Sequence, residues 1–153
     1  VEMDLLLVNL KLLGMHDRDL SRLPDYCARA AAACGVEVPH NYPVVGEDAF
    51  RTGTGVHAAA IIKAIRKDDD WLVHRVYSGV PADEFGLEQT IEISPVSGLS
   101  NVKYWLEAHG YDPGDEELCG ALFDLAKQSD HTLTREEIER EIRRVRSGGA
   151  PAG

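Results

Sequence analysis

Apolar and polar positions recur along this chain mostly at the spacing of an amphipathic helix. Near the C-terminus, Ile138, Ile142 and Val145 fall on one helix face. Thr134 and Glu137 precede this stripe in the pattern of a capping box, so a helix should begin there. Similar patterns predict further helices over 3–14, 21–34, 57–66, 102–109 and 115–128. The sequence therefore predicts a mainly α fold with at most one or two short strands.

Glycine, proline and acidic residues mark the breaks between these helices. Gly35 should end the second helix, whose first turn accepts Pro24 and whose cap is predicted to be Ser21. Several shorter segments are predicted between the helices: an extended loop over 36–45, one helical turn over 47–50, a short capped segment over 71–76, a loop over 78–85 and a short strand or extended stretch over 89–93. No internal repeat is visible.

The first predicted helix, over 3–14, is apolar on nearly every side. Helices of this kind are buried or packed between layers of a larger core. Alone, this helix has little to pack against, and the chain begins with Val1 in an apolar run. We therefore expect the chain to be a piece of a larger protein.

Composition and charge narrow the class of protein. The 153 residues are 44% apolar and 27% charged, with a formal net charge of −10, so a nucleic-acid partner is not expected. No apolar run approaches the roughly 20 residues that span a bilayer, and no secretory signal is visible. Cys27, Cys34 and Cys119 do not form a disulfide framework. We expect them to be buried, reduced thiols in a cytoplasmic protein.

One segment concentrates the candidate chemistry. Gly53-Thr54-Gly55 precedes a helical run, and His57 follows two residues after the second glycine. This spacing places the imidazole at a helix entrance, on a backbone that can approach another molecule closely. A histidine can exchange protons near neutral pH, although many such histidines only bond a carbonyl group. Tyr77 is a phenol at the edge of a loop rich in glycine and proline, and a packed aromatic is its alternative interpretation.

The remaining patterns give weaker signals. The chain has no His-x-His, Cys-x-x-Cys or His-Glu-x-x-His motif, so a metal site of its own is not expected. Three adjacent aspartates, 68–70, do not face one point on a helix. Ser97, Ser100 and Asn101 precede or open a predicted helix; helix capping is the simpler interpretation, and anion binding is the alternative.

Three blocks of the chain resemble the C-terminal part of the 2-isopropylmalate synthase and homocitrate synthase family. VVGEDAF over 44–50, followed by TGVH over 54–57, is similar to the family pattern V-G-x-x-A-F…[ST]-G-[IV]-H. The other two blocks are YSGVPADEFG over 77–86 and SGLSNVKYWL over 97–106. The resemblance covers most of residues 1 to 110 and, more loosely, the last two predicted helices.

The resemblance implies a fold and an activity. Members of this family condense acetyl-CoA with a 2-keto acid on a metal-dependent (β/α)8 barrel, which would precede Val1. Residues 1–14 would then be the last barrel helix, 15–76 and 77–146 two helical subdomains, and 147–153 a flexible tail. Such an arm reaches across a dimer to the neighbour's active site. Matched by position, His57 and Tyr77 would be the catalytic residues of the arm, and Thr54 and Gly55 would bind substrate.

The resemblance also implies the partners. A zinc, magnesium or manganese ion is expected in the barrel, and no cofactor is expected in this chain. The chain and the barrel would belong to a homodimer or a heteromeric assembly. The chain departs from the pattern A-F-x-H-x-S-G-I-H-Q at Thr52, Thr54 and Ala58, which leaves the keto acid open. The alternative is a non-catalytic helical interaction module in which His57 and Tyr77 are purely structural.

Overall fold

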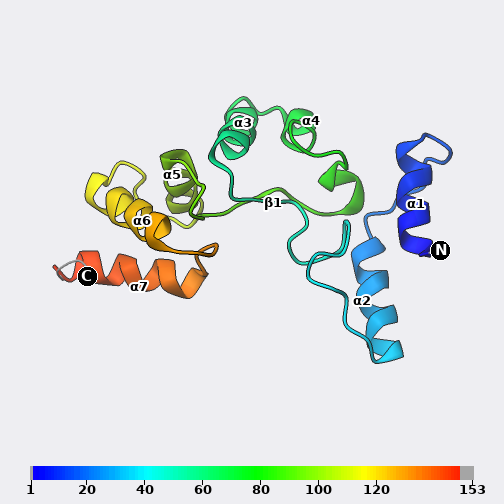
Figure 1. Ribbon diagram of the computed structural model, residues 1–153. Coiled ribbons are helices and arrows are strands. Elements are labelled where there is room, and N and C mark those ends of the chain that lie inside the picture. Colours follow the sequence, from blue (N-terminus) through cyan, green and yellow to red (C-terminus); the bar gives the residue numbers. More distant parts are fainter. Residues whose placement is uncertain (1, 149–153) are drawn as a thin grey trace. The chain divides into compact units, whose positions relative to one another are not determined.

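The structure, a computed structural model, describes residues 2–148 (Figure 1). Within this part of the chain 52% of the residues are helical, and the only strands are two short parallel ones. This confirms the mainly α class. The chain divides into two compact units, and each is formed by two separate stretches of sequence. Unit 1 comprises Val1–Arg51 and Asp70–Gln89, and unit 2 comprises Thr52–Asp69 and Thr90–Gly153.

Unit 1 contains helices α1 (Met3–Leu12), α2 (Leu23–Cys34) and α4 (Asp70–Val73), and the 3-10 helix η1 (Ala82–Phe85). Helices α1 and α2, η1 and the loops beside them contribute to one small apolar core, in which Phe85 is completely buried. The other buried members of this core are Val8, Leu20, Leu23 and Val44. The loop predicted over 78–85 thus contains one turn of 3-10 helix, and the residues 47–50 form turns rather than a helical turn.

Helix α2 begins and ends close to the predicted positions. Its N-cap is Arg22, without a side-chain capping bond, and Pro24 lies in the first turn. The predicted cap at Ser21 is therefore wrong; the Ser21 amide instead donates to the Asp19 carboxylate at 2.8 Å. Gly35 ends the helix in the left-handed conformation, with φ of 65°, as its position predicted.

The burial of two apolar features differs from expectation. In α1 only Val8 is buried, whereas Met3, Leu6 and Leu12 stay exposed, because this chain covers only one stripe of the helix. The three thiols are free of disulfides, yet Cys34 is exposed and only Cys119 is buried. Burial raises the pKa of the Cys119 thiol above its usual value.

Unit 2 contains helices α3 (Gly55–Arg66), α5 (Leu99–Ala108), α6 (Glu116–Gln128) and α7 (Arg135–Arg146). These helices pack in successive pairs: α3 on α5, α5 on α6 and α6 on α7. Figure 1 shows α5, α6 and α7 side by side. Strand β1 (Arg51–Thr52) pairs with β2 (Thr90–Ile91), so part of the strand predicted over 89–93 is present. The core of the unit includes the fully buried side chains of Val102, Leu106, Leu122 and Ile138.

The start of α7 has the predicted capping box. The Thr134 hydroxyl accepts from the Glu137 amide at 3.3 Å, and the Glu137 carboxylate accepts from the Thr134 amide at 2.8 Å. The division of the sequence at residues 14, 76 and 146 stays a prediction. The tail predicted over 147–153 lies, from residue 149 onward, outside the described residues.

Candidate functional site

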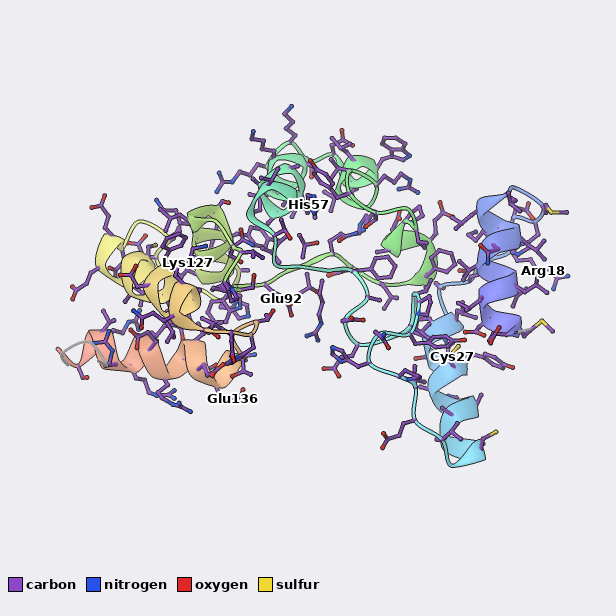
Figure 2. The ribbon with its side chains drawn as sticks, viewed as in Figure 1. Arg18, Cys27, His57, Glu92, Lys127 and Glu136 are labelled. Atoms are coloured by element: carbon purple, nitrogen blue, oxygen red, sulfur yellow. The ribbon has the colours of Figure 1, made fainter. Side chains whose placement is uncertain are left out.

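His57 lies in the first turn of α3. The helix has Thr54 as its N-cap, so that His57 is the third helical residue, after Gly55 and Val56. The imidazole is exposed, whereas the next residue, Ala58, is completely buried in unit 2. Figure 2 shows His57 at this helix. The helix therefore holds its backbone against the unit while the histidine side chain reaches solvent.

The turn before α3 is held through the carbonyl group of Gly53. The Ser97 hydroxyl donates to this oxygen at 2.6 Å, the Ser94 hydroxyl at 3.2 Å and the Asn101 amide at 3.3 Å. The preceding residue is also bonded, since the Glu92 amide donates to the Thr52 carbonyl at 3.0 Å. The backbone leading to His57 is thus fixed by a segment some 40 residues further along the chain.

The two glycines of the turn are needed for contacts within the chain. A Cβ atom on Gly53 would lie 2.8 Å from the Ser94 hydroxyl oxygen, and one on Gly55 would lie 2.6 Å from the Gly98 backbone nitrogen. The expectation that this backbone approaches another molecule is therefore wrong for these faces of the turn, which are occupied by residues 94 and 98. Close packing of the two segments is what requires glycine here.

Of the three polar residues for which helix capping was the simpler interpretation, Asn101 caps the start of α5, whereas the Ser97 hydroxyl bonds the Gly53 and Glu92 carbonyl groups instead. The Asn101 side-chain oxygen accepts from the Gly98 amide at 3.2 Å, and its NH2 group donates to the Glu92 carbonyl at 2.9 Å. Asn101 is completely buried, and Ser97 is 2% exposed. Their polar groups are thus committed to bonds within unit 2.

A lysine of helix α6 holds the segment that precedes α5. The Lys127 ammonium group donates to the carbonyl groups of Pro95 and Ser97, at 2.7 and 2.8 Å. It also lies 4.8 Å from the centre of the Phe123 ring. Figure 2 shows Lys127 on this helix.

Tyr77 lies in unit 1, on the irregular segment between α4 and η1, and its side chain is 51% exposed. The side chains on either side make hydrogen bonds within unit 1. The Arg75 guanidinium group donates to the Glu84 carboxylate at 2.8 Å, and Gln89 donates to the Ser78 hydroxyl at 2.7 Å. The residues that flank Tyr77 are thus joined to others of the same unit through their side chains.

The structure places the candidate residues in different units. His57, Thr54 and Gly55 lie together at the start of α3 in unit 2, whereas Tyr77 belongs to unit 1. Thr54 is exposed, and its hydroxyl makes no capping bond to α3. The catalytic roles of His57 and Tyr77 and the substrate-binding roles of Thr54 and Gly55 stay predictions.

Sequence reasoning did not identify the set that holds the turn. Ser97 and Asn101 were expected at a helix start, but their bonds to Gly53 join distant segments and leave no local pattern. The small residues around Gly98 were the available signal, because buried serine and asparagine beside glycine indicate close backbone packing. Lys127 had no such signal, since it reads as an ordinary cation near a helix end.

Among residues 2–148, no three histidine, cysteine, aspartate or glutamate side chains come together as a metal site. The described residues therefore do not fit the metal that the family resemblance implies for a barrel. Likewise, no helix of this part of the chain has both the length and the apolar character needed to cross a bilayer.

Comparison with known proteins identifies relatives over most of the chain. No protein-family model matches it. A homocitrate synthase of Pyrococcus horikoshii is 29% identical over 134 residues, which are 88% of this chain and 34% of the relative. A homocitrate synthase of Pyrococcus abyssi is 33% identical over 73% of this chain and 28% of the relative. A probable 2-isopropylmalate synthase of Archaeoglobus fulgidus is 31% identical over 61% of this chain and 17% of the relative.

The chain belongs to the homocitrate synthase and 2-isopropylmalate synthase family. It spans about a third or less of the length of these curated relatives, so it corresponds to a part of the family's enzymes. A match of 134 residues within a chain of 153 necessarily includes the segments with His57 and Tyr77. These segments therefore lie within the part of the chain that matches this relative.

Proposed function

We propose that this chain is the helical arm of an acyltransferase that condenses acetyl-CoA with a 2-keto acid. In this proposal His57 and Tyr77 act in the active site of a partner barrel, which carries the metal. The observation that carries the proposal is the match to homocitrate synthases over 88% of the chain, including the segment that exposes His57.

The reaction has two stages. The acetyl methyl group loses a proton, the resulting enolate carbon bonds to the keto carbon, and the keto oxygen gains a proton. Water then cleaves the thioester to a carboxylate and free CoA thiol. Negative charge develops on the thioester oxygen in both stages, so hydrogen-bond donors at that oxygen lower the barrier. An imidazole and a phenol are donors of this kind.

The exposure of both side chains supports this assignment. A residue that serves a neighbouring active site must reach beyond its own unit, and Tyr77 is 51% exposed while His57 is also exposed. The backbone that leads to His57 is hydrogen-bonded within unit 2, which limits the motion of this donor and favours preorganisation. When the arm covers the active site, it also excludes water during condensation.

Helix α1 exposes apolar side chains, which supports the presence of a further packing partner. Met3 is 60% exposed and Leu13, just past the end of the helix, is 74% exposed. Large exposed apolar side chains along one helix are typical of a surface that other protein covers. In the proposed enzyme this partner is the barrel, to which α1 adds as a last helix.

The test uses the assembled synthase, in which this chain is joined with its barrel. Acetyl-CoA is supplied with a panel of 2-keto acids, and release of free thiol is followed. We expect His57→Ala to lower kcat by about 10²–10⁴-fold, with little change in the KM for the keto acid. His109→Gln is the matched control, because His109 is an exposed histidine of the same unit, and it should keep full turnover.

Two results would contradict the proposal. Unchanged turnover of His57→Ala would remove the histidine from the mechanism. A chain that is stable and monodisperse alone, with no barrel protein in the preparation and no thiol release on reconstitution, would favour the alternative of a non-catalytic interaction module.

A further inference from the structure

The polar side chains around the Gly53 carbonyl are unusual for their burial. Asn101 is completely buried, Ser97 is 2% exposed and Ser94 is 5% exposed. Placing polar side chains in a core costs free energy unless each finds partners. Each of these three side chains has such partners within unit 2.

All three residues donate to one acceptor. Ser97, Ser94 and Asn101 reach the Gly53 oxygen at 2.6, 3.2 and 3.3 Å. A carbonyl oxygen has two lone pairs, so these three donors are enough to occupy the acceptor fully, with Ser97 the shortest at 2.6 Å. Gly53 comes directly before the N-cap of α3 and four residues before His57.

The residues on either side of Gly53 are fixed by the same segment. Before Gly53, the Glu92 amide donates to the Thr52 carbonyl. The Glu92 carbonyl in turn accepts from the Asn101 side chain at 2.9 Å. Beyond Gly53, the Gly55 amide donates to the Val96 carbonyl at 3.2 Å. The entry to α3 is therefore bonded to residues 92–101 at three residues, Thr52, Gly53 and Gly55.

We propose that Ser97 and Asn101 are positioning residues for His57, because they hold the turn from which α3 begins. They do not touch the substrate. Their hydrogen bonds set where the first turn of α3 lies and therefore where the imidazole points. This inference rests on the proposed role of His57 in the condensation.

The alternative is that these residues only stabilise unit 2. A purely structural role predicts a loss of stability with no specific effect on the step that uses His57. A positioning role predicts that the variants lose turnover only while His57 is present. A double-variant cycle separates the two roles, since effects that pass through one residue are not additive.

The experiment measures thiol release by the assembled synthase carrying Asn101→Asp or Ser97→Ala. Asn101→Asp keeps the oxygen that caps Gly98 but cannot donate when ionised, and Ser97→Ala removes one hydroxyl with little change in volume. We expect kcat to fall by about ten- to a hundredfold, because small displacements of a catalytic group are costly, with the KM for the keto acid unchanged. In the His57→Ala background, the same substitutions should change kcat by less than about twofold.

Ser147→Ala is the matched control. Its hydroxyl also donates to a backbone carbonyl, that of Arg144 at 2.9 Å, but at the exposed end of α7. Turnover should stay within about twofold of the unmodified enzyme. Amide hydrogen exchange should be faster over residues 55–57 in Ser97→Ala, while the core amides of α6 keep their protection. This readout also verifies that the variant is folded.

The outcomes distinguish the two proposals. If His57→Ala lowers turnover but Ser97→Ala and Asn101→Asp turn over normally, or lose the same factor in both backgrounds, the positioning role is wrong and the proposed function stands. If His57→Ala keeps full turnover, the proposed function fails, and the positioning role fails with it. If Asn101→Asp does not fold, Ser97→Ala alone decides by the same comparison.

Discussion

At the scale of single residues, the chain uses glycine to bring two helix starts together. Gly55 opens α3 and Gly98 is the N-cap of α5, and a Cβ on the first would lie 2.6 Å from the backbone nitrogen of the second. Backbone atoms cannot move aside as the end of a flexible side chain can. The glycine at position 55, two residues before His57, is thus required by packing within unit 2.

This contact predicts a specific cost for Gly55→Ala. We expect it to lower the free energy of unfolding by about 1–3 kcal/mol, because the added methyl group overpacks a closed site. The matched control is Gly120→Ala, in the middle of α6, where no atom lies within 4 Å of an added Cβ. Alanine should stabilise that helix by about 0.5–1 kcal/mol. Denaturant unfolding of both variants checks the pair, and equal effects would contradict the packing argument.

Tyr77 leads to a second prediction at this scale. In the assembled synthase, Tyr77→Phe should lower kcat by about fivefold, since it removes one neutral hydrogen bond worth roughly 1 kcal/mol, while the ring is retained. Tyr26→Phe is the matched control, because Tyr26 is 58% exposed in the same unit. Thiol release by the two variants is compared under saturating acetyl-CoA. Equal turnover of both would assign the Tyr77 hydroxyl to structure alone.

At the scale of elements, the start of α7 carries a titrating cluster. The His131 ring contacts the Asp130 carboxylate at 2.9 Å and the Glu137 carboxylate at 3.2 Å. Hydrogen bonds with Asp130 and then Glu137 raise the pKa of His131 above 6.5. The Thr134 amide, followed by His131, lowers the pKa of Glu137 below 4.5. The capping residue Glu137 therefore joins the helix cap to the histidine.

The cluster predicts how stability depends on pH. Because the pKa of His131 is raised on folding, its contribution is complete below about pH 6.5 and is lost as the pH rises through the folded value. The lowered pKa of Glu137 adds a contribution that is complete above about pH 4.5. We expect the difference in unfolding free energy between the unmodified chain and His131→Gln to shrink from pH 6 to pH 8. Parallel curves over this range, from chemical unfolding, would contradict the role of His131.

At the scale of the whole molecule, each unit has its own core. Phe85 is fully buried in unit 1 and Leu122 is fully buried in unit 2. Unit 1 is nevertheless built from two stretches of sequence that flank a part of unit 2. Stability at this scale thus depends on contacts between residues far apart along the chain.

Because the two cores are separate, a cavity in one core should destabilise the unit that contains it. Leu122→Ala should destabilise unit 2 by about 2–5 kcal/mol, and amide exchange should become faster in α5, α6 and α7. Protection in α1 and α2 should persist, because their buried side chains belong to the other core. Phe85→Ala is the reciprocal variant and should give the reverse pattern. Loss of protection throughout the chain in either variant would mean that the cores unfold together.

The sequence by itself determined the helices, the capping box of α7 and the left-handed end of α2. These features depend on residues within a few positions of one another, such as Thr134 and Glu137, so local patterns encode them. The family blocks also singled out His57 and Tyr77 as candidates. They could not tell which groups hold the backbone beside these residues.

Only the tertiary structure decided what the glycines and buried polar residues do. Ser97 and Asn101 bond Gly53 across 44 and 48 positions of sequence, and no local pattern specifies a partner at that distance. The exposure of α1 and the Arg22 cap of α2 likewise depend on which surfaces the rest of the chain covers. Periodicity records which faces prefer burial, whereas packing between distant segments decides which of them are buried and which polar groups meet.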